Sequence, residues 1–141
     1  MIKLVFCLRR LPTLSAPEFH RYWVEDHADL VRQHAPTLRI RRYTQNHTFS
    51  DRRLSPAIEA RGGQIDPFDG VAELWWDSVE DLFEARSTAE GQIAGCALLS
   101  DERTFIDLPN SPLFFTNEHL ITQHDELCPL DPAGGGRLRE V

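Results

Sequence analysis

The chain has 141 residues, 41% of them hydrophobic and 26% charged, which suits one globular domain rather than two. Its net charge of −7 argues against nucleic acid as a partner, because phosphate binding needs clustered positive charge. Cys7, Cys96 and Cys128 are too widely spaced for a disulfide framework or a zinc cluster, and the apolar run 2–8 is too short to span a membrane. We therefore expect a cytoplasmic protein.

The first elements are a strand and a long helix. Residues 2–9 alternate as in a strand, which Pro12 ends. Ser15 and Glu18 then form a capping box that begins a helix running to Pro36. One apolar side of this helix carries Phe19, Trp23, His27, Leu30, Val31 and His34.

Two further strands follow, separated by a long connection. Residues 38–49 are strand-like, and Tyr43, Gln45 and His47 share one face. Residues 50–69 contain prolines and glycines, which predicts a long loop with one helical turn around 56–61. In the strand 71–76, the residues that face one way are Ala72, Leu74 and Trp76.

The C-terminal half completes the pattern. Ser78 caps a second helix, a shorter helix runs from 90 to 99, and the last strand spans 113–123. The order predicts an α+β, ferredoxin-like βαββαβ domain over 1–127, with a four-stranded antiparallel sheet and a Pro/Gly-rich tail over 128–141. Because the helices cover one face of the sheet, a second subunit is expected on the other, giving a homodimer.

Four segments carry a family resemblance. They are 19–28 (FHRYWVEDHA), 43–47 (YTQNH), 69–76 (DGVAELWW), and 101–107 (DERTFID) followed by 117–119 (NEH). In this order they resemble the EthD family, from about the first strand to the last. The resemblance implies a dimeric α+β barrel without a bound cofactor. Similar proteins include polyketide cyclases, decarboxylases, dehydratases, muconolactone isomerases and cofactor-free monooxygenases, so the fold alone does not choose the chemistry.

The resemblance also bears on individual residues. Muconolactone isomerases of this group have a histidine that lines up with His27 and a tyrosine that lines up with Tyr43. Their cysteine on the third strand falls on Leu74 here, so a mechanism that needs this thiol is not expected.

His27, Tyr43 and His47 are the expected catalytic residues. Burial on an apolar helix face would keep His27 neutral, which suits a general base, although a core histidine bonded to a backbone carbonyl has the same pattern. Tyr43 could donate to an oxyanion, and His47 could act as a second acid or base at the pocket mouth. The residues expected to line an apolar substrate pocket are Phe19, Trp23, Ala72, Leu74, Trp76 and Phe83.

No metal or cofactor is expected. His20, His27 and His34 are seven residues apart, about 10 Å of helical rise, which is too far for one ion. Gly-rich phosphate loops and HExxH or GxSxG motifs are absent from the sequence. We expect an enzyme of the lyase or isomerase kind that acts by acid–base chemistry on an apolar, aromatic or polyketide-like carbonyl substrate. The alternatives are a non-catalytic small-molecule-binding protein that supports a degradation pathway, and a cofactor-free monooxygenase.

Overall fold

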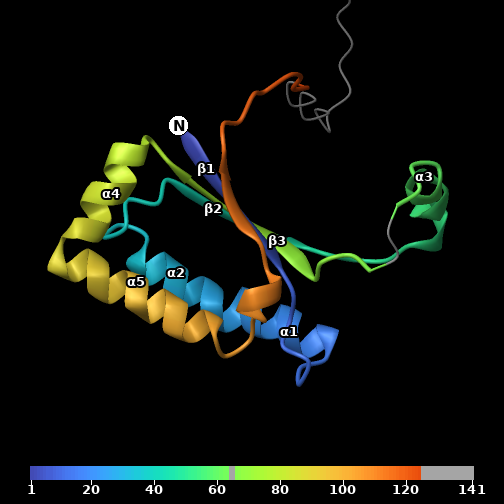
Figure 1. The fold of residues 1–141 in the computed structure, drawn as a ribbon, viewed down its shortest axis with the longest axis horizontal. Coiled ribbons are helices and arrows are strands. Elements are labelled where there is room, and N and C mark those ends of the chain that lie inside the picture. The colour runs from blue at the N-terminus through green and yellow to red at the C-terminus, as the bar shows by residue number, and fades with distance from the viewer. Residues whose placement is uncertain (64–65, 125–141) are drawn as a thin grey trace, which may run out of the picture.

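A computed structural model describes residues 1–63 and 66–124 of the chain. Its sheet has four antiparallel strands in the order β2-β3-β1-β4, with the helices α1, α2, α4 and α5 gathered on one face (Figure 1). The predicted α+β, ferredoxin-like arrangement is confirmed. The elements are β1 (Ile2–Leu8), α1 (Ala16–Tyr22), η1 (Trp23–His27), α2 (Ala28–His34), β2 (Arg42–His47), η2 (Arg52–Leu54), α3 (Ser55–Glu59), β3 (Gly70–Trp76), α4 (Val79–Ser87), α5 (Ala89–Glu102), η3 (Leu108–Asn110) and β4 (Leu113–Thr116).

The long first helix is three consecutive segments. Its start is as predicted, since the Ser15 hydroxyl accepts a hydrogen bond from the Glu18 N–H at 3.2 Å. Between α1 and α2, however, η1 is a π-helical turn, in which the Ala28 N–H donates to the Trp23 carbonyl five residues earlier. Such wide turns are rare and occur often at functional sites.

Three predicted boundaries are wrong. The second strand begins at Arg42 rather than at 38, because Arg39 adopts a left-handed backbone with φ of 56°. The helix predicted over 90–99 is longer and runs from Ala89 to Glu102. The last strand ends at Thr116 instead of 123, where its pairing with β1 stops.

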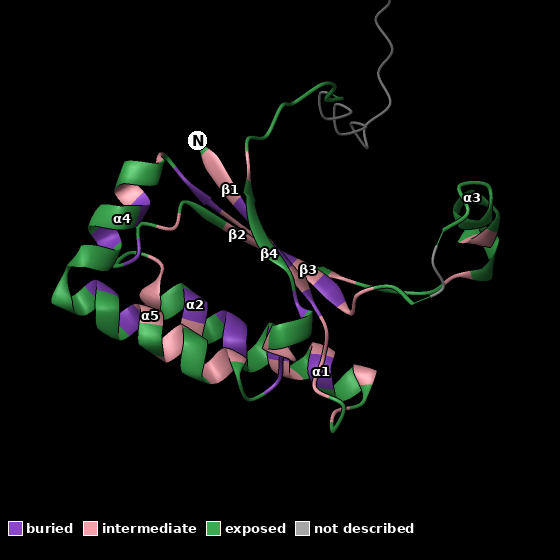
Figure 2. Ribbon diagram, viewed as in Figure 1, coloured by how far each residue is buried: buried purple, intermediate pink, exposed green. Residues whose placement is uncertain are grey.

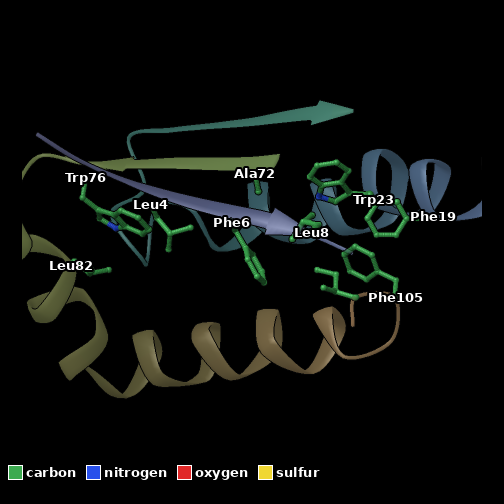
Figure 3. Close-up of a cluster of buried hydrophobic side chains, with 10 residues drawn as sticks. Leu4, Phe6, Leu8, Phe19, Trp23, Ala72, Trp76, Leu82 and Phe105 are labelled. Carbon is green, nitrogen blue, oxygen red and sulfur yellow. The ribbon is translucent and has the colours of Figure 1, made fainter. Parts of the chain in front are cut away.

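The core lies between the sheet and the helices, where the buried residues are concentrated (Figure 2). Leu4, Phe6 and Leu8 extend from β1 toward the helical layer (Figure 3). One end of the cluster is aromatic, with Phe19, Trp23 and Phe105 side by side, and the other end holds Trp76 and Leu82 (Figure 3). Packing of this cluster fixes the helices on the sheet.

The opposite face of the sheet is mixed in character. Lys3 forms an ion pair with Glu73 at 3.3 Å and lies over the Trp75 ring. The Trp75 indole N–H donates to Glu118 at 2.8 Å. On the neighbouring strand Phe114 pairs with Val5 and is half-exposed. This face therefore combines charge pairs with accessible apolar surface.

The connection 48–69 leaves the body of the domain. Its predicted helical turn is confirmed by η2 and α3, which Figure 1 places away from the helical layer. Within the described part of the chain, no helix is both long and apolar enough to cross a membrane. The tail predicted over 128–141 and its boundary with the domain lie outside the described residues.

Candidate functional site

A cavity of about 530 Å³ lies between the sheet and α5. Its wall is mainly apolar and includes Leu4 and Phe6 from β1, Leu74 and Trp76 from β3, Leu82 from α4 and Leu98 from α5. A cavity of this size and lining is typical of sites for small apolar ligands.

Two glycines of α5 on the cavity wall differ in their surroundings. A Cβ added at Gly91 would lie 1.7 Å from the Ala85 carbonyl oxygen, so the close approach of α4 and α5 requires glycine there. A Cβ added at Gly95 would meet nothing within 4 Å. Close packing is therefore not the reason for a glycine at position 95. The absence of a side chain there leaves room at the cavity wall.

Glu102 is an ionisable residue on this apolar wall. It lies at the last position of α5 and is half-buried. Burial is the main cause that raises the pKa of its carboxyl from 4.5 to about 7. The negative charge of Asp101 adds to the shift, while the positive charge of Arg86 opposes it. A carboxyl that changes protonation near neutral pH is suited to acid–base chemistry.

Asp101, the preceding residue, holds His27. The Nδ1 atom of His27 lies 2.7 Å from Asp101 Oδ2, and the Tyr22 hydroxyl donates to Oδ1 of the same carboxyl. Because a carboxylate only accepts, Nδ1 carries the proton and leaves Nε2 as the basic nitrogen. Burial lowers the pKa of His27, as predicted, while Asp101 acts in the opposite direction. The partner of Nδ1 is thus this carboxylate, and not a backbone carbonyl as in the alternative of a purely structural core histidine.

Tyr43 belongs to a second polar group, on the helix-facing side of β2. Its hydroxyl oxygen accepts from the Gln45 side-chain amide at 2.9 Å and from the Trp23 indole at 3.2 Å. With both bonds directed to the oxygen, the hydroxyl proton is left to donate elsewhere. Burial raises the pKa of Tyr43, and the Glu102 charge also acts to raise it.

His47 closes this second group. Its Nε2 donates to Gln45 Oε1 at 2.8 Å, so its neutral Nδ1 accepts from His20 Nδ1, also at 2.8 Å. The ring stacks on Trp23 with centroids 4.5 Å apart. Burial and the neighbouring His20 lower the pKa of His47. A groove of about 420 Å³ beside β2 is lined by Tyr43 and Gln45 together with Arg32 and Arg41.

The structure separates the residues that the sequence groups in one pocket. Leu74 and Trp76 line the cavity under α5, whereas Phe19, Trp23 and Ala72 are packed in the core. The expectation for Phe83 is wrong, because its side chain is 68% exposed on the outer side of α4. Of the three catalytic candidates, His27 is buried beside Asp101, and Tyr43 shares the β2 network with His47.

Sequence reasoning missed Tyr22, Gln45, Asp101 and Glu102 as site residues. A signal was present for all four, since each lies in one of the segments 19–28, 43–47 and 101–107 that resemble the EthD family. Within residues 1–63 and 66–124, His, Cys, Asp and Glu side chains form no group of three that could hold a metal ion. His20 and His27 instead have separate partners, His47 and Asp101.

Solved structures show the same fold. An EthD family protein from Bacillus halodurans is 23% identical, with a TM-score of 0.56, over 84% of this chain and 99% of its own. An EthD-like protein from Ralstonia eutropha is 16% identical, with a TM-score of 0.53, over 82% and 88%. A dimeric protein of unknown function and ferredoxin-like fold from Bacteroides fragilis is 8% identical, with a TM-score of 0.52, over 83% and 95%.

No curated protein matches the chain at a significant level. The EthD domain family, in contrast, matches residues 11–109, which is well over half of the 141 residues. The match begins before the first helix and ends beyond Asp101 and Glu102, so it contains both polar groups and most of the cavity wall. The chain therefore belongs to the EthD family.

Proposed function

We propose that this protein is a small-molecule enzyme that moves protons on an apolar carbonyl compound, with His27 as the general base. The observation that supports the proposal is the His27–Asp101 pair, which fixes the imidazole tautomer and leaves Nε2 without a hydrogen-bond partner among the described residues. Burial keeps this imidazole neutral, and therefore basic, near pH 7. The Asp101 carboxylate stabilises the imidazolium that forms when the proton is taken.

Tyr43 is the proposed donor to the oxyanion or enolate that such a step produces. Two hydrogen bonds to its oxygen orient the ring and leave its proton available to the substrate. His47 acts through Gln45 and is a positioning residue in this scheme. Because His27 is 5% exposed, substrate contact with Nε2 requires small shifts of its neighbours, as is common when catalytic contacts tighten on binding.

Acid–base chemistry of this kind covers cyclisation, dehydration, decarboxylation and isomerisation. Cyclisation, dehydration and isomerisation require removal of a proton from a carbon next to a carbonyl group, and decarboxylation gives the same kind of enolate, which is then protonated. An assay of enolate formation and protonation therefore tests this chemistry without the natural substrate. The assay follows deuterium exchange by NMR at the methyl group of 1-acetonaphthone, an enolisable aryl ketone, in heavy water. Exchange above the buffer rate is expected with the wild-type protein.

The variants make this assay specific. His27→Ala and Asp101→Asn should lower the catalysed exchange by 10²-fold or more, the usual scale of general-base catalysis. His34→Ala, which changes another histidine further along the same helical stretch, should leave it unchanged. Binding without exchange in the wild type would support the non-catalytic reading instead. Exchange unaffected by His27→Ala would remove His27 from the mechanism.

We also infer a homodimer assembled through the uncovered face of the sheet. Phe114 and Val5 provide apolar surface on this face, and the protein from Bacteroides fragilis with the same fold is described as dimeric. Light scattering should give twice the monomer mass. Phe114→Glu should shift the mass toward the monomer, whereas Phe83→Glu, an equally polar change on α4, should not. A monomeric wild type at high concentration would contradict the inference.

A further inference from the structure

Glu102 and the cavity under α5 are absent from the catalytic scheme above. The carboxyl lies on a wall formed mainly by leucine, isoleucine, phenylalanine and tryptophan side chains, to which Arg86, Gln92 and Cys96 also contribute. A ligand that fills this cavity covers the Glu102 carboxyl and removes water from it. A polar group left unpaired there is costly, so a ligand that forms a hydrogen bond with Glu102 is favoured over one that cannot.

We propose that protonated Glu102 donates a hydrogen bond to the carbonyl oxygen of a neutral, apolar ligand held in the cavity under α5. This inference goes beyond the proposed function, because His27 and Tyr43 are not among the residues that line the cavity. It assigns Glu102 as the recognition residue for the carbonyl group. The natural ligand is then a flat ketone or related carbonyl compound of about two rings, a size that the cavity of about 530 Å³ accommodates.

Gly95 supports the assignment independently of charge. It lies two helical turns before Glu102 on the cavity wall, and open space surrounds the position of its missing Cβ. Glycine costs about 1 kcal/mol relative to alanine inside a helix. A glycine with no packing or backbone requirement in the middle of α5 is consistent with a cavity that must stay open.

Burial, rather than the surrounding charges, favours the neutral form of Glu102. Burial is the leading cause of the raised pKa, and Asp101 on the same helix adds to it. Arg86, from α4, is the opposing charge, and it is exposed at the cavity. Tyr43 on β2 is neutral at this pH because burial raises its pKa, and Cys96 is the remaining titratable residue on the wall. Burial therefore brings the titration of Glu102 close to neutral pH, where its protonated form is accessible.

The test compares two probes of nearly equal shape by quenching of tryptophan fluorescence, since Trp76 lines the cavity. The probes are 1-acetonaphthone, which has a carbonyl acceptor, and 1-ethylnaphthalene, which lacks it. At about pH 5.5 the ketone should bind about tenfold more tightly than the hydrocarbon, the scale of one well-formed hydrogen bond. At about pH 8.5, above the pKa of about 7, the preference should disappear.

Three variants separate Glu102 from other titrating groups. Glu102→Gln keeps a hydrogen-bond donor that does not titrate, so its preference for the ketone should persist at both pH values. Glu102→Leu removes the donor and should bind both probes equally. Glu90→Gln removes an exposed carboxyl from the first turn of the same helix and should behave as the wild type.

Gly95→Leu should weaken binding of both probes at least tenfold while the protein remains folded, because the added side chain enters the cavity. A ketone preference in the wild type that does not change with pH, or that survives in Glu102→Leu, would overturn the proposal. So would unchanged affinity in Gly95→Leu. Binding of the probes and His27-dependent deuterium exchange are measured separately. Either the assignment of Glu102 or the proposed function can therefore be rejected without the other.

Discussion

Replacement of Glu102 by glutamine should stabilise the protein at neutral and alkaline pH. A buried carboxyl whose pKa rises from 4.5 to about 7 binds its proton more tightly in the folded chain than in the unfolded chain. The folded protein therefore loses stability as the pH rises from about 4.5 to about 7, and the full penalty is present above that range. At 1.36 kcal/mol for each pKa unit, the penalty is about 3 kcal/mol. Glutamine has nearly the same shape and no charge.

Urea unfolding followed by tryptophan fluorescence gives the free energy of unfolding of both proteins across the pH range. The difference, Glu102→Gln minus wild type, should be small below about pH 4.5 and should rise to a plateau of about 3 kcal/mol above pH 7. Glu90→Gln, compared in the same way, controls for the loss of one exposed carboxyl from α5. A difference that stays flat between these pH values, or a glutamine variant less stable than the wild type at pH 8, would refute the electrostatic account of Glu102.

Three other predictions concern the core and the His27 pair. Phe105→Ala should lower the free energy of unfolding by about 3–5 kcal/mol, because Phe105 is 1% exposed, whereas Phe83→Ala on the surface should change it by less than about 0.5 kcal/mol. Gly70→Ala should lower the free energy of unfolding in urea by about 1–3 kcal/mol, since an added Cβ would lie 2.4 Å from an indole carbon of Trp23. Unchanged stability would contradict this close packing. Asp101→Asn should lower the pKa of His27 in an NMR titration, because the Asp101 carboxylate raises it, and a rise would show that the pair does not form.

Local sequence signals predicted the elements better than their ends. The Ser15 and Ser78 caps are formed as expected, because a cap depends on only a few neighbouring residues. The start of β2 could not be placed in this way. The Trp76 indole N–H donates to the Leu38 carbonyl at 2.8 Å, and this contact holds the chain in a turn where the sequence alone is strand-like.

The candidate site was predictable only in part. His27 has a visible pattern, because it recurs on the apolar side of a helix with Phe19 and Trp23. Glu102 lies in a segment that resembles the family, but its burial could not be predicted, since the cavity wall beside it is formed largely by residues distant in sequence, such as Leu4 and Leu74. The difference between Asp101 and Glu102 also depends on the tertiary structure. The Asp101 carboxylate pairs with His27, whereas the neighbouring Glu102 carboxyl is on the cavity wall, where burial raises its pKa.

The π-helical turn has a consequence for how this chain tolerates changes in length. The Trp23 carbonyl accepts from both the Ala28 N–H and, at 2.8 Å, the Gln45 side chain, so the wide turn ties the helix to β2. Removal of one residue from 24–26 would place the Ala28 N–H four residues after the Trp23 carbonyl, the ordinary helical spacing, so α1 and α2 could keep their places on the sheet. A one-residue deletion within α1 or α2 would instead rotate everything on one side of it by about 100°. The wide turn is therefore the position in this helical stretch where the loss of one residue should disturb the packing of Phe19 and His27 least.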